Sequence, residues 1–179
     1  MRKTFLVLGI CCVLATPAWA GGGFTLFGSY SEVNDDGQDF GAGVRVTLGG
    51  EKWVGDLTWT WYPSTEDVET IAGIEDKLQV IPTDVGGRYL FQTDGSFKPY
   101  LGAGLTFFWV NLNDGNGDNA FGAYALAGFT LGANRTRFFA EVLYRFGESD
   151  VRYHSVPEDI TGKMDVMGLG INAGITWAF

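Results

Sequence analysis

Cysteine is almost missing from this chain of 179 residues, because its only two, Cys11 and Cys12, lie near the start. Residues 1–20 begin with a basic pair, continue as a short apolar run and end in small residues at Ala20. This pattern predicts a secretory signal peptide cleaved after Ala20. A lipoprotein is the alternative, but an isoleucine precedes the first cysteine, where that processing requires a small side chain. The mature chain, residues 21–179, is then expected to hold no disulfide and no thiolate-bound metal.

Basic residues are scarce as well. Outside the signal peptide, 10 basic residues stand against 21 acidic ones, a net charge of −11. Such an acidic chain is a poor partner for nucleic acid, whose phosphates require lysine and arginine. No apolar run reaches the roughly 18 residues of a membrane helix, and no stripe of 3.6-residue period is long enough to predict a helix. We expect one all-β domain over residues 21–179.

The chain does contain residues that alternate between apolar and polar or small, which is the period of a β-strand. The alternating segments are Phe24–Tyr30, Phe40–Leu48, Trp53–Tyr62, Leu78–Phe91, Tyr100–Val110, Phe121–Leu131, Phe138–Phe146 and Met167–Phe179. A transmembrane strand needs only about 9–11 tilted residues. We therefore predict eight strands, most of them long enough to cross the hydrocarbon layer.

The connections between these segments alternate in length. The short ones are 49–52, 92–97 and 132–137, and the longer ones are 31–39, 63–77, 111–120 and 147–163. Outer-membrane barrels have short periplasmic turns and longer outside loops. The short connections are the second, fourth and sixth, which lie in the periplasm if both termini do. This order predicts an eight-stranded, antiparallel, up-and-down transmembrane β-barrel with short periplasmic turns and longer extracellular loops.

Charged residues within the strands lie opposite the apolar face. They are Arg45, Asp56, Asp84, Arg88, Glu141 and Arg145. An arginine facing lipid at mid-depth costs roughly 2–4 kcal/mol, so this face is expected to line the lumen and to form a charge network. Charges in a narrow interior must pair to offset their desolvation. We interpret the network as a packed polar core that closes the lumen, with a proton or ion path as the alternative.

Aromatic residues near the strand ends predict the girdles that mark the two membrane interfaces. The girdle residues are Trp53, Trp61, Tyr89, Trp109, Tyr144 and Trp177.

Glycines occur mainly on the lumenal face, where a small barrel has little room. Pro82 cannot donate a hydrogen bond to a ladder, so we expect the fourth strand's pairing to be disturbed there.

The final strand has a polar residue, a glycine and two late aromatics at Asn172, Gly174, Trp177 and Phe179. This ending resembles the C-terminal assembly signal of bacterial outer-membrane barrels. Three internal strings, at 87–91, 98–104 and 138–146, together with Ile81-Pro82, resemble the OmpA/OmpX-type eight-stranded outer-membrane β-barrel superfamily. The resemblance implies a Gram-negative outer-membrane location, contact with membrane lipid and lipopolysaccharide, and assembly by the barrel-assembly machinery. We expect a monomer.

Members of that superfamily differ in function, so the fold alone does not decide the role. We expect a non-enzymatic structural or surface-interaction role of adhesion type, through acidic extracellular loops. A narrow channel for small solutes or ions is one alternative, and a lipid A-modifying enzyme is another. An enzyme would need a base beside its nucleophile. The only histidine, His154, is followed by Ser155, but neighbours in an extended segment point apart, so no catalytic residue is assigned.

Two loops raise the question of a metal. The segment 114–119 begins like a calcium loop, but Asn119 stands where that motif has glycine and Ala125 where it has glutamate. Like Asn34–Gly37, it is interpreted as a turn. No metal site and no cofactor are predicted, although acidic loops beside lipopolysaccharide could share its divalent cations.

The structural alternative to the membrane barrel is a soluble calycin-like barrel, with its apolar face turned inward around a ligand.

Overall fold

The computed structural model describes residues 21–33, 37–63, 67–69, 75–112, 116–117, 119–132, 135–153, 160–165 and 168–179. The predicted signal peptide, residues 1–20, lies outside this part of the chain. His154 and Ser155 also lie outside it, as do most residues of the two possible calcium loops. No helix in the described residues is long and apolar enough to cross a membrane.

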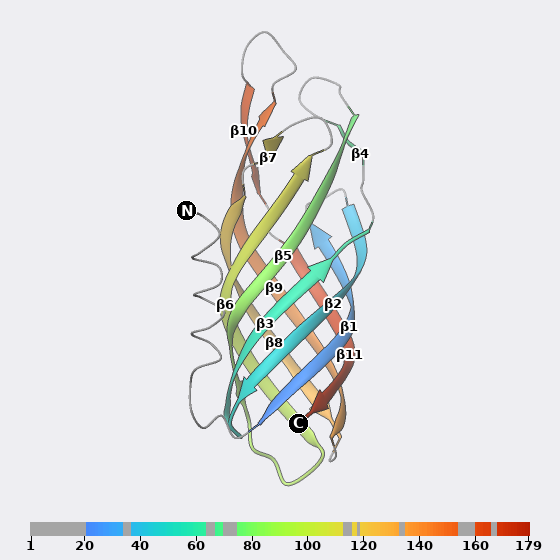
Figure 1. The fold of residues 1–179 in the computed structure, drawn as a ribbon, viewed down its shortest axis with the longest axis vertical. Helices are drawn as coiled ribbons and strands as arrows, with labels where there is room; N and C mark the ends of the chain where they lie inside the picture. Colours follow the sequence, from blue (N-terminus) through green and yellow to red (C-terminus); the bar gives the residue numbers. More distant parts are fainter. Residues whose placement is uncertain are drawn as a thin grey trace.

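The described chain consists of β-strands joined by turns (Figure 1). Their bounds are β1 Gly22–Val33, β2 Gly37–Gly49, β3 Trp53–Trp61, β4 Asp67–Glu69, β5 Glu75–Leu90, β6 Phe97–Leu112, β7 Asn116–Gly117, β8 Ala120–Leu131, β9 Thr136–Tyr153, β10 Ile160–Asp165 and β11 Gly168–Ala178. The short strands β4, β7 and β10 lie together at one end of the molecule, at the top of Figure 1, and the C-terminus lies at the other end.

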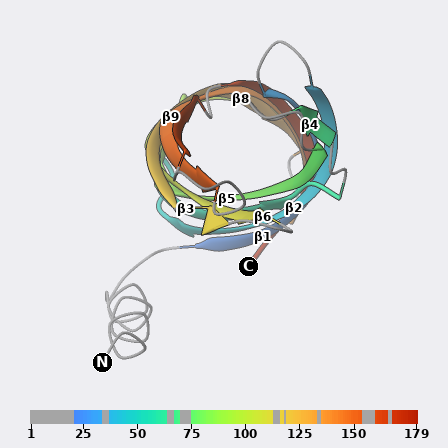
Figure 2. The ribbon, with the colours of Figure 1, turned by 90° about the horizontal axis from the view of Figure 1, so that it is seen from above.

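The eight long strands form a closed barrel. They pair in the order β9-β11-β1-β2-β3-β5-β6-β8, and a further pairing of β8 with β9 completes the ring seen in Figure 2. Every one of these pairings is antiparallel. Because the sheet has closed on itself, the barrel leaves no continuous open edge, which is what hydrocarbon demands of backbone N–H and C=O groups. The predicted eight-stranded antiparallel barrel is confirmed.

The four longer connections are shorter than predicted, because the strands continue beyond the alternating segments. β9 runs on to Tyr153 and pairs with β10, so the segment 147–163 is largely a hairpin rather than a loop. β4 pairs with the start of β5 inside the predicted loop 63–77. The apolar alternation marks only the part of a strand that carries the outward apolar face. Backbone pairing does not need an apolar face, so the ladders extend past the point where the sequence signal stops.

The apolar face of the sheet points outward. Along β1, Leu26 is 45% exposed, whereas its neighbour Thr25 is 2% exposed and faces the interior. The same contrast holds for Leu105 on β6, at 65%, and Thr106, which is fully buried. Trp59 also lies on the outer face. This orientation contradicts the soluble calycin-like barrel, whose apolar face would surround a central ligand.

Pro82 lies where one of its two ladders ends. On the β6 side the pairing continues through it, with Pro82 opposite Phe108. On the β3 side the last pair is Trp59 with Thr83, one residue short of the proline. The predicted disturbance therefore affects one side of β5 only. Proline has no N–H group to contribute to the missing pair, which explains why the β3 ladder stops at this position.

Glycines on the inner face make room for neighbouring side chains. A Cβ atom on Gly128 would lie 2.6 Å from the Ala140 carbonyl oxygen, 2.6 Å from the Glu141 Cβ and 2.8 Å from the Tyr100 ring. By contrast, Gly28 faces outward and a Cβ there would meet nothing within 4 Å. The lumenal glycines are thus required by space, as expected of a barrel just wide enough for its side chains.

These two positions give a matched test of lumen packing. Gly128→Ala is expected to destabilise the barrel by about 1–3 kcal/mol, because the added methyl overpacks the interior. Gly28→Ala is expected to be neutral or stabilising by up to about 1 kcal/mol, since it only restricts the unfolded chain. Urea unfolding of the barrel refolded into lipid vesicles measures both. Equal stabilities of the two variants would contradict a tightly packed lumen.

Candidate functional site

The charge network predicted from the sequence lies inside the barrel. All six members are buried, from Glu141 at 2% exposed to Arg88 at 7%. Among the described residues they form three ion pairs: Arg45 with Glu141, Arg88 with Asp56, and Arg145 with Asp84. Two of these pairs join strands that are not neighbours in the sheet, so they cross the lumen. The third joins the adjacent strands β3 and β5.

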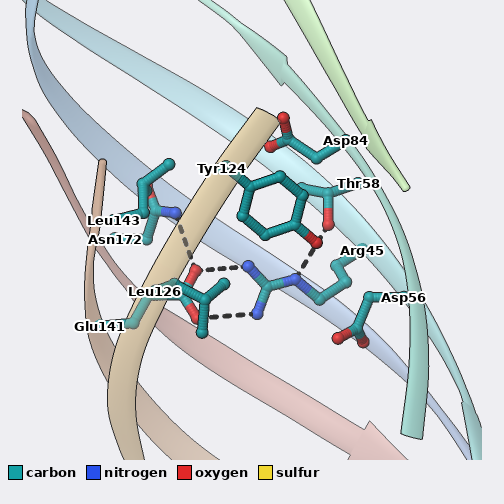
Figure 3. A pocket seen from close by; sticks show the side chains of 9 residues that line it. All are labelled: Arg45, Asp56, Thr58, Asp84, Tyr124, Leu126, Glu141, Leu143 and Asn172. Carbon is teal, nitrogen blue, oxygen red and sulfur yellow. Dashed lines mark hydrogen bonds and ion pairs between the residues drawn. The ribbon is translucent and has the colours of Figure 1, made fainter. Parts of the chain in front are cut away.

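The pair between Arg45 on β2 and Glu141 on β9 is bidentate. Arg45 Nη1 donates to one carboxylate oxygen over 3.0 Å, Nη2 donates to the other, and Nε donates to Thr58 Oγ1 over 3.0 Å. Glu141 also accepts the Tyr100 hydroxyl at 2.8 Å and Asn172 Nδ2 at 2.9 Å. Figure 3 shows the Arg45, Thr58 and Asn172 contacts converging in the lumen. A fork-to-fork geometry with extra donors is the arrangement in which a buried pair offsets its desolvation.

The guanidinium of Arg45 is also enclosed by aromatic rings. Its Cζ lies 5.6 Å from the Phe27 ring centre and 5.4 Å from the Phe139 ring centre. The two rings meet each other edge to face, with centres 6.1 Å apart. Cation–π contacts of this kind are worth more when the cation is removed from water. They hold the arginine in the orientation that its carboxylate partner requires.

Arg88 on β5 and Asp56 on β3 form the second pair. Arg88 Nε donates to one oxygen of Asp56 over 2.5 Å and Nη2 to the other over 2.8 Å. Thr47 Oγ1 donates to Asp56 over 2.7 Å and accepts from Arg88 Nη2 over 3.2 Å. Arg88 Cζ lies 4.8 Å from the centre of the Tyr100 ring. Because the Tyr100 hydroxyl donates to Glu141, this residue connects the first two pairs into one network.

Arg145 on β9 and Asp84 on β5 form the third pair, four residues further toward the long loops than Glu141 and Arg88 on the same strands. Arg145 Nε and Nη2 donate to Asp84 over 3.2 and 2.7 Å. Thr106 Oγ1 donates to the same carboxylate over 2.7 Å. Beyond this pair, the hydroxyls of Tyr62 and Ser29 are 2.9 Å apart. The polar contacts thus extend along the lumen rather than forming a single ring.

The lumen at the centre of this network is closed. The space lined by Arg45, Asp56, Asp84, Glu141 and their neighbours, which are drawn in Figure 3, is too small to hold a water molecule. Apolar side chains complete the filling, because Tyr100, Tyr124, Leu126 and Leu143 form a buried cluster. Buried oxygens of Thr60, Thr130 and Asn172 have no hydrogen-bond partner. Chemically, this arrangement holds each lumenal charge in a fixed pair with its opposite.

Several of these residues were not singled out from the sequence. Tyr100, Thr58 and Thr106 complete the hydrogen bonding of the three pairs, and Phe27 and Phe139 enclose Arg45. Each of them alternates in register with the inward face of its strand, so the period of two could have placed them in the lumen. The sequence carried no signal for which partner each of them contacts.

The predicted girdle residues lie on the outer face. Trp53 and Trp61 are the first and last residues of β3, and both are exposed. Trp109, Tyr144 and Trp177 are also exposed, while Tyr89 is half-buried. Rings meet edge to face along this surface, as between Trp53 and Tyr89 with centres 4.9 Å apart. These positions suit side chains that have an apolar body and a polar tip at a lipid interface.

The four residues of the predicted assembly signal face different directions. Asn172 is buried and donates to Glu141, whereas Trp177 and Phe179 are exposed on the outer face. Gly174 approaches the Leu26 carbonyl and the Phe27 backbone so closely that a Cβ would not fit. Phe179 exchanges two backbone hydrogen bonds with Gly22, of 2.9 and 3.1 Å. The last residue therefore takes part in closing the barrel against β1.

Within the described residues, no group of three or more His, Cys, Asp or Glu side chains is placed to hold a metal ion. The carboxylates of the lumen are instead each paired with an arginine.

Comparison with known proteins agrees with this architecture. No protein-family model and no curated protein matches the chain. Among solved structures, Neisserial surface protein A is similar, with a TM-score of 0.63 and 15% identity over 89% of this chain and 96% of that one. Outer membrane protein AlkL is similar at a TM-score of 0.64 and 13% identity, over 92% of each chain. The N-terminal β-barrel domain of Pseudomonas aeruginosa OprF has a TM-score of 0.50 and 13% identity, over 88% of this chain and 97% of that one. With its apolar face outward and its charges enclosed, the chain has the fold of the eight-stranded outer-membrane β-barrels, the OmpA/OmpX-like architecture.

Proposed function

We propose that the chain is an integral protein of the Gram-negative outer membrane with a structural or surface-interaction role, performed by the end of the barrel that carries the longer connections. The observation that carries this proposal is the closed lumen. Three bidentate ion pairs and a cluster of large side chains fill the space through which a solute would pass. The role therefore belongs to the outer surface and not to the interior.

The shape of the long-connection end supports the same proposal. β9 continues well past the last lumenal charge, Arg145, and pairs with β10 from Glu148–Asp165 to Tyr153–Ile160. β7 adds a second pairing to β9 at Val151 and Arg152. A paired hairpin presents a surface with less conformational freedom than a loop, so binding through it costs less ordering entropy. Such a platform suits contact with another surface.

The acidic loops define the chemistry of that contact. Acidic residues predominate in the sequence of the first two long connections, at Glu32, Asp35, Asp36, Asp39, Glu66, Asp67, Glu69, Glu75 and Asp76. They suit a basic partner, or divalent cations shared with neighbouring lipopolysaccharide. The proposal includes a monomer inserted by the barrel-assembly machinery, and it assigns no catalysis. Lipid A of unchanged mass in cells that express the protein is the corresponding expectation.

The ion-pair network is expected to stabilise the barrel. Arg45→Met leaves the Glu141 carboxylate unpaired in the lumen and is expected to cost about 3–5 kcal/mol of unfolding free energy. Adding Glu141→Gln should recover most of this loss, since a glutamine still accepts from Tyr100. Arg135→Met, at an exposed turn position, is the control and should stay within about 0.5 kcal/mol. Urea unfolding in vesicles measures all three. If Arg45→Met alone is as stable as Arg135→Met, the Arg45–Glu141 pair does not hold the lumen closed.

The closed lumen also predicts the electrical behaviour of the barrel. In planar bilayers the wild-type protein is expected to pass almost no current, because Arg45 and Glu141 join opposite walls of the lumen. Arg45→Ala combined with Glu141→Ala removes that connection and should raise the conductance. If the wild-type protein passes a steady current as large as that of the double variant, the proposal is overturned in favour of a channel.

Shortening the hairpin tests the surface role directly. An Asn-Gly turn in place of residues 149–164 would join Glu148 to Asp165, which already lie opposite each other. Two quantities are compared between cells with and without the intact protein: the rate at which suspended cells sediment and their resistance to vancomycin. Cells that express the shortened variant are expected to behave in both assays like cells without the protein. Arg135→Met again serves as the matched control. If the shortened protein is fully active in both assays, the hairpin is not the interacting surface.

A further inference from the structure

One groove on the outer wall of the barrel is not explained by the closed lumen. It has a volume of about 430 Å³ and lies across β1, β2, β3 and β5. Its lining residues are Leu26, Phe27, Ala42, Gly43, Val44, Trp59, Thr60, Trp61 and Ile81. This volume falls within the roughly 300–1,000 Å³ of sites that take a small ligand.

Differences in side-chain size form the groove. Ala42 provides a low floor on β2, because its outward side chain is only a methyl group, and Gly43, whose Cβ position points toward the buried Phe27 ring, lines the groove with its backbone. Trp59 and Trp61 on β3, which are 40% and 51% exposed, stand beside that floor. Ala42 is paired directly with Trp61 and Gly43 with Thr60. The Trp61 indole therefore stands directly opposite a methyl side chain, while Trp59, two residues earlier on the same face of β3, is paired with Val44.

The end of the β3–β5 ladder adjoins the groove. Beyond the pair of Trp59 with Thr83, the residues Thr60 and Trp61 have no ladder partner on β5. Ile81, which lines the groove from β5, lies across this gap and is itself paired to Trp109 on β6. The β3–β5 ladder thus ends beside the low part of the groove at Ala42. Pro82, which has no N–H group, fixes the position where the ladder ends.

The groove is continuous with the surface that meets lipid. Leu26, Trp59 and Trp61 belong to the same exposed apolar face as the rest of the outward side chains. Trp61 is the last residue of β3, so the groove lies toward the long-connection end of the barrel. With that end outside the cell, as in the proposed function, this depth corresponds to the outer leaflet.

We infer that the groove binds one acyl chain of a lipid A molecule in the outer leaflet, with the indoles of Trp59 and Trp61 packed along the chain. This inference rests on the proposed outer-membrane location. A flexible alkyl chain can enter a narrow apolar groove beside a tryptophan. A second barrel presents a broad, convex face and would leave such a groove unfilled. A retained lipid would also cover the stretch of wall where the ladder is interrupted.

The test compares two phenylalanine substitutions on the outer face. Ala42→Phe fills the floor of the groove, whereas Ala125→Phe places the same ring on β8, at another exposed outward position. Each protein is refolded into vesicles that contain equal amounts of hexa-acylated lipid A and phosphatidylethanolamine. A heat-dependent gel shift establishes folding and insertion, and native mass spectrometry after detergent extraction then identifies the retained lipid.

Wild type and Ala125→Phe are expected to retain one lipid A, and Ala42→Phe to retain it at least about tenfold less often. Brominated acyl chains on the lipid A should also quench the fluorescence of wild type more than that of Trp59→Phe. Equal retention by all three barrels, a preference for phosphatidylethanolamine or a dimer mass would overturn the inference. Failure to insert into vesicles would instead contradict the proposed membrane location. The conductance test addresses the closed lumen alone and does not depend on whether lipid A is retained.

Discussion

A sheet that closes on itself inside a membrane has only one place to put charge. Its outer face meets hydrocarbon, where an ionised side chain costs several kcal/mol, so the arginines and carboxylates in the middle of the wall must point inward. The interior of an eight-stranded barrel is only wide enough for side chains. Charges confined there lose their hydration and must find partners. The pairing of Arg45, Arg88 and Arg145 with three carboxylates follows from this constraint, and so does the closed lumen.

Much of this arrangement could be read from the sequence, because period-two alternation assigns each strand residue to one of two faces. Parity alone placed the six charges together and the tryptophans on the opposite face. Alternation says nothing about the stagger of strands around a barrel, however. It could not show that Arg45 on β2 meets Glu141 on β9, although the strands β1 and β11 lie between them in the sheet. It also gave no hint that Tyr100 joins two of the pairs.

The sequence was least informative where the membrane ends. Apolar alternation reflects contact with lipid, and β9 and β10 continue their pairing into a region where no lipid selects for apolar residues. The sequence pattern therefore predicts a loop where the structure has a hairpin. Asn172 shows a different limit: its place near the C-terminus suggested an assembly signal, yet its side chain also donates to Glu141 at the centre of the barrel. The terminal motif alone does not predict this contact with Glu141.

The pairing of the first strand with the last has a consequence for the time course of folding. The hydrogen bond between Thr25 and Thr176 joins residues 151 positions apart, and Phe179 completes the β1–β11 seam at Gly22. Contacts between such distant residues form slowly, because the entropy of closing a very long chain segment must be overcome before they are made. One edge of the first strand stays unpaired until the final strand is available. The whole polypeptide must therefore be synthesised before the barrel can close, and the unpaired edge of the first strand is open to aggregation during that interval.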